Sequence, residues 1–168
     1  MTKGRLQLAL AASLLLAAPS WAAGTAKGVV TVAGKKLTLS NVYAYAQTGF
    51  FDKTKTDVVV ILSDMPIPAV DGHTPDEVAR NQAALEAAVQ QFLSLTLDAE
   101  GQVISLRPQH KAFKIVPSGA SSNFVFEKKV HDGKLVSGRA YSKVPQKGFD
   151  GEVWEFDVTF ESAVAPKK

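Results

Sequence analysis

The side chains able to do chemistry gather most densely in one short stretch, residues 64–77. Four acids and one histidine lie there, namely Asp64, Asp71, His73, Asp76 and Glu77. The carboxylates of such a loop can hold Ca²⁺, and a histidine beside an acid can transfer protons. The stretch therefore offers a metal site made by Asp64, Asp71 and His73, or the site of a hydrolase or metal-dependent enzyme that uses residues 64–77 with His73.

The same stretch also has a purely structural interpretation. Thr74, Pro75 and Glu77 fit the N-cap, N1 and N3 positions of a helix, and Asp71-Gly72 is typical of a turn. The EF-hand spacing is absent, as are the H-E-x-x-H zinc motif, the G-x-S-x-G nucleophile elbow and a glycine-rich phosphate loop. We therefore predict no cofactor, and we favour a binding module over an enzyme.

A second candidate site combines tyrosines with one cation. Tyr43 and Tyr45 alternate along one predicted strand, and Arg139 and Tyr141 along another. Aromatic rings and a guanidinium group on a concave sheet suit an organic anion or a saccharide. The alternative is that the tyrosines cover the core with their hydroxyls in water, and that Arg139 lies along them.

Alternation of apolar and polar residues predicts the strands that carry these side chains. The predicted strands are residues 27–32, 36–46, 58–62, 93–98, 102–107, 112–116, 123–130, 135–144 and 152–161. In the second strand, Leu37, Leu39, Asn41, Tyr43 and Tyr45 are predicted to share one face. Short strands joined by turns favour a mainly β fold, an antiparallel β-sandwich or barrel of about eight or nine strands.

One α-helix is predicted at about 75–91, packed on the sheet through an apolar stripe made by Val78, Leu85, Val89 and Phe92. Before it, the run 58–62 predicts a central core strand, since it is apolar, β-branched and followed by Pro66 and Pro68. The aromatic pair Phe50-Phe51 and the acid Asp64 should then lie at opposite ends of that strand.

The first residues of the chain have the layout of a secretory signal. Lys3 and Arg5 precede an uncharged, mostly apolar stretch at 6–18, and Ser20-Trp21-Ala22 supplies small residues for cleavage. The stretch is shorter than the ~20 residues that a membrane-spanning helix needs. We predict a signal peptide at 1–22, then a single exported domain at 23–168 with no membrane span, in the periplasm or outside the cell.

The net charge and the cysteine content further limit which classes of protein this chain can belong to. Removing residues 1–22 takes away Lys3 and Arg5 and no acid, which lowers the net charge from +3 to +1. No clustered basic face is visible along the chain, because Lys35-Lys36 falls in a predicted turn and Lys128-Lys129 on a strand, so we predict no nucleic-acid partner. The chain has no cysteine, so disulfides cannot stabilise it and packing must.

The chain also resembles a group of uncharacterised bacterial secreted proteins. The similar segments are the G-K-x-hydrophobic hairpin and Y-A strand end of 32–46, the ILSD-x-P-hydrophobic-P segment of 61–68, the G-R-x-Y strand of 138–141 and the F-D-V-T-F strand of 156–160. The resemblance implies a secreted β-rich domain and assigns no role to any residue. We expect a non-catalytic envelope module that binds a small molecule or another envelope protein.

The signal peptide gives the first testable prediction. The protein recovered from an envelope fraction should begin at Ala23, because cleavage follows the Ser20-Trp21-Ala22 site, or at Gly24 if cleavage follows Ala23. Mass spectrometry of the intact protein measures this directly. A chain that retains Met1 and stays in the cytoplasm would contradict export.

Overall fold

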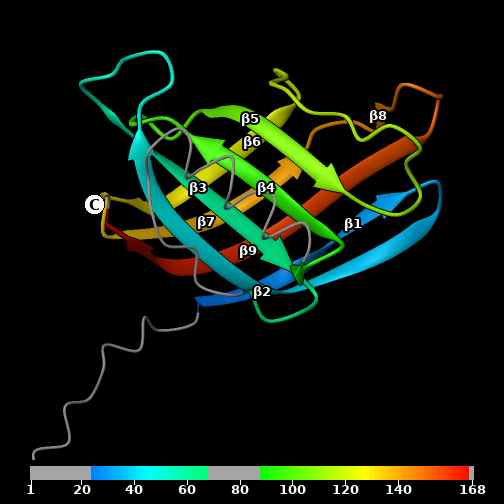
Figure 1. Ribbon diagram of the computed structural model, residues 1–168, viewed down its shortest axis with the longest axis horizontal. Helices are drawn as coiled ribbons and strands as arrows, with labels where there is room; N and C mark the ends of the chain where they lie inside the picture. The colour runs from blue at the N-terminus through cyan, green and yellow to red at the C-terminus, as the bar shows by residue number, and fades with distance from the viewer. Residues whose placement is uncertain (1–23, 68–87, 167–168) are drawn as a thin grey trace, which may run out of the picture.

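The computed structural model describes residues 24–67 and 88–166, and within them nine strands form one sheet (Figure 1). The strands are β1 (Gly24–Val32), β2 (Lys35–Thr48), β3 (Thr56–Ser63), β4 (Phe92–Leu97), β5 (Val103–Gln109), β6 (Phe124–His131), β7 (Leu135–Ser142), β8 (Gln146–Lys147) and β9 (Val153–Ala165). The prediction of a mainly β, antiparallel fold is confirmed.

The pairs Ala33-Gly34, Glu100-Gly101 and Asp132-Gly133 are typical of tight turns, and all three lie in turns that join hairpins. Ala33 and Gly34 join β1 to β2 with positive φ at both positions, as a two-residue hairpin turn requires. Gly101 between β4 and β5 and Gly133 between β6 and β7 also have positive φ. In the last turn the carboxylate of Asp132 accepts the backbone N–H groups of residues 134 and 135, which fixes the turn.

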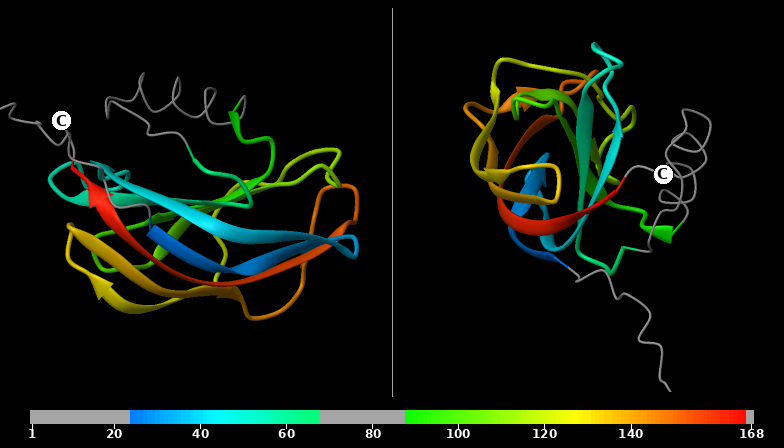
Figure 2. Two further views of the ribbon diagram at one scale, coloured as in Figure 1. Left: turned by 90° about the horizontal axis from the view of Figure 1, so that it is seen from below. Right: turned by 90° about the vertical axis from the view of Figure 1, so that its left-hand side faces the viewer.

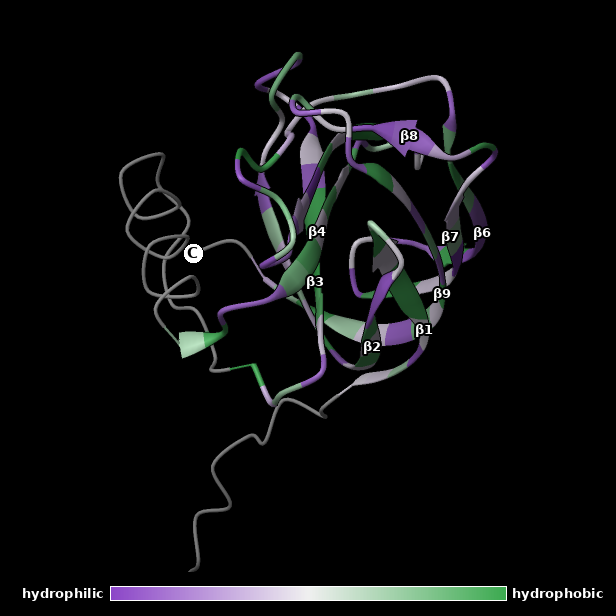
Figure 3. Cartoon of the chain, turned by 90° about the vertical axis from the view of Figure 1, so that its right-hand side faces the viewer, coloured by the Kyte–Doolittle hydropathy of each residue, from purple (hydrophilic) through white to green (hydrophobic). Residues whose placement is uncertain are grey.

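The order of the strands makes the sheet curl into a half-barrel. The order is β5-β4-β3-β2-β1-β9-β7-β6, with β8 beside β9. Neighbours are antiparallel, except that β2 also pairs with β9 in parallel at Ala44–Val164 and Tyr45–Ala165. Figure 2 shows the sheet wrapping around, so that the edge strands β5 and β6 turn towards each other. Seen from the end that carries β8, the strands run around a common axis (Figure 3).

The main hydrophobic core fills the inside of this curl. Strand β9 alternates as predicted: Trp154, Phe156, Val158 and Phe160 are buried, and the residues between them face outwards. Their aromatic rings pack against Phe124 and Phe126 of β6, with ring centroids between 5.5 and 5.9 Å apart. Such aromatic packing supplies much of the apolar burial in a chain without disulfides.

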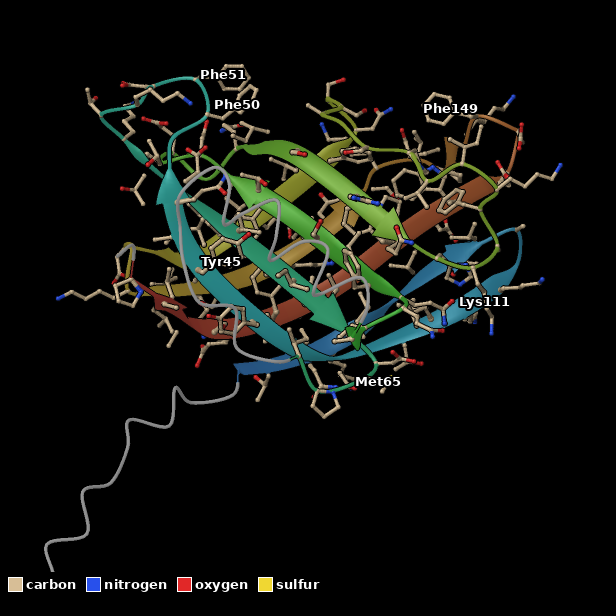
Figure 4. All side chains as sticks on the ribbon, in the orientation of Figure 1. Tyr45, Phe50, Phe51, Met65, Lys111 and Phe149 are labelled. Carbon is tan, nitrogen blue, oxygen red and sulfur yellow. The ribbon has the colours of Figure 1, made fainter. Side chains whose placement is uncertain are left out.

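Strand β3 is buried on both of its faces, as its uninterrupted apolar run predicted. Val58, Val60 and Leu62 belong to the core inside the curl, whereas Val59 and Ile61 belong to a second apolar cluster on the outer face of the sheet. Phe50 and Phe51 lie before this strand and Met65 after it, at opposite ends (Figure 4). The predicted separation of the aromatic pair from Asp64 is confirmed.

The helix predicted at about 75–91 falls mostly outside the described residues. In the described part only Ala88 is helical and residues 89–91 are not, so the helix is not confirmed and its predicted end is wrong. The reason is pairing: Phe92 lies opposite Ser63 as the first residue of β4, which requires an extended chain. Val89 and Phe92 are both buried, in the outer cluster.

The strand predicted at 112–116 does not form. These residues lie in the connection between β5 and β6, where Phe113 donates its N–H to the carbonyl of His110. The Phe113 ring turns inwards to Trp154, with centroids 6.1 Å apart. A strand needs a partner, and the connection pairs with the sheet only at the bridge between Leu106 and Gly119.

Close approach of β1 to β9 gives a prediction about Gly28. A methyl group there would collide with the carbonyl oxygen of Asp157 and the Cα of Val158. We expect Gly28→Ala to lower the free energy of unfolding by about 1–3 kcal/mol, as overpacking does. Urea unfolding measures the change, with the exposed neighbour Lys27→Ala as control. Equal stability of the two variants would contradict it.

Candidate functional site

The tyrosines and the arginine predicted to form one site lie in two separate places. Tyr43 and Tyr45 lie on β2 with ring centroids 6.2 Å apart, and Tyr45 lines a pocket on the outer face of the sheet. Arg139 and Tyr141 lie on β7 and line a different depression, beside Asp157 of β9. The structure therefore brings each pair together but does not bring the two pairs to one site.

The side chains of β2 do not point to the two faces of the sheet in the predicted pattern. Leu37 and Leu39 point into the core, but so do Val42, Ala44 and Ala46, while Tyr45 belongs to the outer cluster. The inward positions change from odd to even where the pairing of β1 with β2 shifts register. A period-two pattern cannot be extended across such an irregularity. The prediction that Leu37, Leu39, Tyr43 and Tyr45 share one face is therefore wrong.

Arg139 is held by carboxylates of its own sheet. Its Nε and Nη2 donate to the two carboxylate oxygens of Asp157 at 2.9 and 2.7 Å. Its guanidinium carbon lies 4.6 Å from the Tyr141 ring centroid, and the Tyr141 hydroxyl donates to Glu127 at 3.0 Å. The hydrogen bond to Asp157 raises the pKa of Arg139, and the same bond lowers the pKa of Asp157. An anionic ligand would have to compete with these carboxylates for the guanidinium group.

The predicted metal residues are only partly described. Asp64 lies in the exposed turn that follows β3, whereas Asp71 and His73 fall outside the described residues. In residues 24–67 and 88–166, no group of three His, Asp or Glu side chains is placed to hold a metal ion. The metal site at Asp64, Asp71 and His73 stays a prediction.

One pocket in the described part of the chain lies on the outer face of β2, β3, β4 and β5. Its volume is about 410 Å³. The described residues that line it are Tyr45, Gln47, Phe50, Val59, Ile61, Phe92, Ser94, Thr96, Ile104 and Ser105. We refer to it as the outer-face pocket.

The lining of the outer-face pocket divides into an apolar floor and a polar side. Val59, Ile61 and Phe92 are buried members of the outer cluster and form the floor. Ser94, Thr96 and Ser105, on the adjacent strands β4 and β5, contribute hydroxyl groups. None of the described lining residues carries a charge. The arrangement suits a neutral molecule that is largely apolar and has a hydrogen-bonding group.

Tyr45 adds one more hydroxyl group to this lining. Burial raises the pKa of Tyr45 to about 12, and the neighbouring Tyr43 contributes in the same direction. The phenol therefore stays protonated and neutral at any physiological pH. It can donate or accept a hydrogen bond, but it cannot act as a base near neutrality.

An aromatic pair stands at one end of the pocket on the loop between β2 and β3. Phe50 lines the pocket and is 67% exposed; Phe51 is 78% exposed and packs edge-on against it, with centroids 5.0 Å apart. The buried carboxylate of Asp57 accepts the backbone N–H of Phe50 at 2.8 Å. Gly49 donates its N–H to the carbonyl of Lys55, which closes the loop. The loop is thus fixed by hydrogen bonds although its rings are exposed.

Most of this pocket was not foreseen from the sequence. Tyr45 was predicted as a binding residue, but Phe50 was placed only at one end of the central strand, Val59 and Ile61 were assigned to the core, and Ser94, Thr96 and Ser105 to no site. The available signal was the apolar run of β3. A strand that is apolar on both faces needs apolar cover on its outer face as well as in the core, so its outward residues also belong to a buried surface.

No family model matches this chain, and no curated protein and no solved structure matches it either. The resemblance to secreted bacterial proteins therefore stays a prediction. Within the described residues, no helix has the length and apolar character needed to cross a membrane. The function has to be argued from the pocket itself.

One buried histidine lies away from this pocket, in the connection after β5. His110 is 3% exposed, and its Nδ1 accepts the backbone N–H of Ala112 at 3.0 Å. Burial lowers the pKa of His110, and the positive charges of Lys111 and Lys35 lower it further. The neutral ring is therefore part of the folded structure, and protonation would remove the acceptor that holds Ala112.

This histidine predicts a pH dependence of stability. Because its pKa is lower in the folded protein, the unfolded chain binds the extra proton first as the pH falls. The stabilisation is complete above the unfolded pKa of about 6.5 and is lost as the pH falls through the lowered folded pKa. Urea unfolding of residues 23–168 at pH 8 and pH 5, followed by the fluorescence of Trp154, should show the loss.

The control is His110→Asn, whose side-chain oxygen can replace Nδ1 as the acceptor but does not titrate. The variant should lose less stability than the wild type between pH 8 and pH 5. Parallel losses in the two proteins would show that His110 does not cause the dependence.

Proposed function

We propose that this chain is an exported, non-catalytic binding module, and that the outer-face pocket holds its ligand, a small neutral molecule of mostly apolar character. The observation that carries the proposal is the combination of a buried apolar floor, made by Val59, Ile61 and Phe92, with the hydroxyls of Ser94, Thr96 and Ser105 on one side. A volume of about 410 Å³ lies within the range of small-molecule sites, ~300–1,000 Å³.

The polar groups of the described lining are suited to holding a ligand. Serine and threonine hydroxyls and the amide of Gln47 donate and accept hydrogen bonds without changing protonation near neutrality. Tyr45, with its pKa raised to about 12, behaves in the same way. A neutral ligand is favoured because a charged one would leave water for an apolar floor without an opposite charge in the described lining.

The absence of charge in this lining also changes the expected ligand class. The sequence suggested an organic anion or a saccharide bound by the tyrosines with Arg139. Arg139 is engaged by Asp157 and lines a different depression, so it does not support binding in the outer-face pocket. A neutral molecule with one or two hydrogen-bonding groups fits the described lining better.

The placement in the cell envelope is supported by the sequence of residues 1–22, with its basic start, apolar stretch and small residues before Ala23. The alternative of a hydrolase or metal-dependent enzyme rests on the acidic loop of residues 64–77 with His73, and residues 68–77 of this loop lie outside the described residues. His73→Ala distinguishes the two, because a catalytic histidine contributes roughly 10²–10⁴-fold to turnover and a binding module would be unaffected.

The binding proposal is tested by filling the pocket. N-phenyl-1-naphthylamine, a neutral apolar fluorophore, should bind residues 23–168 with increased fluorescence. Thr96→Trp should weaken this binding about tenfold or more, because the indole would occupy the space between β3 and β5. Fluorescence titration measures the dissociation constant, and circular dichroism verifies the fold.

The matched control is Thr38→Trp, which places the same indole on β2 at an exposed residue away from the pocket. It should bind the fluorophore like the wild type. Ser105→Trp reaches the pocket from β5 and serves as a second filling variant. Unchanged binding in both folded filling variants would overturn the assignment of the pocket.

A further inference from the structure

One end of the molecule collects lysines that are far apart in the sequence. Three connections meet there: the β1–β2 turn, the β5–β6 connection and the segment from β7 through β8 to β9. The start of β2 carries the exposed residues Lys35 and Lys36, and the other two connections carry Lys111, Lys114 and Lys147. Among the described residues, the acids at the same end are Asp150 and Glu152 in these connections and Glu155 at the start of β9. We call this surface the basic end.

The three connections contact one another, so the lysines form one surface. Ala33 of the first turn donates its N–H to the carbonyl of Val153 at 2.8 Å. The backbone N–H of Lys114 donates to the carboxylate of Glu152 at 3.4 Å. Lys35 and Lys111 both act on the pKa of His110, which places their charges near the same ring. Sequence inspection found no basic cluster, because its members come from connections that only the fold brings together.

Large apolar side chains project from the same surface. Phe149 is 70% exposed, and Ile115 and Val153 are 56% and 52% exposed. Phe149 precedes Asp150, whose carboxylate lies 4.0 Å from the Nζ of Lys114, the residue before Ile115. Figure 4 shows Phe149 and Lys111 at the end opposite Phe50 and Phe51. Cations interspersed with exposed apolar side chains are the composition of protein surfaces that lie on anionic membranes.

The opposite end differs in its charge. Its turns carry Asp52, Asp98, Glu100 and Asp132 beside Lys53, Lys55 and Lys134, with Lys128 and Lys129 near the end of β6, and Lys55 forms an ion pair with Glu100. Acids are therefore nearly as numerous as cations there, and the Phe50 loop itself carries Asp52 beside Lys53 and Lys55, with Asp57 at the start of β3. Phe50 and Phe51 lie at this end without a net positive surrounding, so the charge favours only one end as a contact with an anionic surface.

We propose that the basic end binds the surface of an anionic lipid bilayer, with lysine ammonium groups on the lipid phosphates and with Phe149, Ile115 and Val153 entering the headgroup region. A soluble polyanion would be attracted by the lysines alone. The exposed apolar side chains favour a bilayer, since only a bilayer offers them an apolar phase next to the phosphates. This binding surface shares no residue with the outer-face pocket and does not depend on the proposed function.

The test uses residues 23–168 and co-sedimentation with vesicles. The protein should bind vesicles of phosphatidylcholine with 30 mol% phosphatidylglycerol and should not bind vesicles of phosphatidylcholine alone. Binding should weaken strongly between 50 mM and 500 mM NaCl, because exposed charges are screened at high salt. Lys35→Glu combined with Lys36→Glu should weaken binding about tenfold or more.

Matched controls change the same properties at the opposite end. Lys129→Glu combined with Lys134→Glu alters the net charge by the same amount and should bind much more tightly than the variant at the basic end. Phe149→Ser should weaken binding several-fold, whereas Phe51→Ser should have little effect. Both aromatic residues are exposed, so neither substitution removes core packing.

Three results would overturn the proposal. Equal losses in the two double variants would show that net charge alone drives binding. If Phe149→Ser binds like the wild type and dextran sulfate binds the protein with the same dependence on Lys35 and Lys36, then the surface recognises soluble polyanions. Absence of binding to the anionic vesicles at 50 mM NaCl would also overturn it.

Discussion

Strand β9 is the element on which the rest of the structure depends. It pairs with β1 and β7 along its length, with β8 at its start and with β2 at its end. Its inward residues carry the aromatic core, and the outward residue Asp157 holds Arg139 of β7. Because the chain has no cysteine, apolar burial around this strand has to stabilise the fold. β9 therefore alternates strictly, because its inward residues must be apolar to form the core and its outward residues must be polar.

The two halves of the same curled sheet use their outer faces differently. Over β6, β7 and β9 the outer face is polar, and Arg139, Asp157 and Glu127 link the strands through charged groups. Over β2, β3 and β4 it carries a second apolar cluster that includes Val59, Ile61 and Phe92. A pocket with an apolar floor forms only where an apolar layer exists on that face. This difference separates Tyr45, which lies at the pocket, from Arg139, which lies in the charged network.

The sequence patterns correctly predicted those features that depend on residues close together along the chain. The turns at Gly34, Gly101 and Gly133 follow from local conformation, and all three are present. The alternation of β9 follows from having one buried face, and it is present too. The predictions failed where the structure of a segment depends on which strand it pairs with. The segment 112–116 has strand-like residues but no strand to pair with.

The candidate site was predictable only in part, for the same reason. Tyr45 was identified by its residue type, but the change of facing along β2 depends on its register with β1. Ser94, Thr96 and Ser105 have no distinguishing pattern, and they become pocket residues because β4 and β5 lie beside the apolar face of β3. Residues that act through neighbours distant in sequence cannot be found from spacing along one strand.

Antiparallel topology explains why a chain of almost balanced charge has one strongly basic end. Each strand reverses direction, so connections far apart in sequence return to the same end of the sheet. The lysines of three such connections add up at one end, while at the other end Lys55 is paired with Glu100. The loop of Phe50, at one end of the outer-face pocket, belongs to the opposite end. A protein resting on a bilayer through its basic end would therefore direct the Phe50 side of the pocket away from the lipid, so that a small molecule could enter from water while the protein stays bound to the surface.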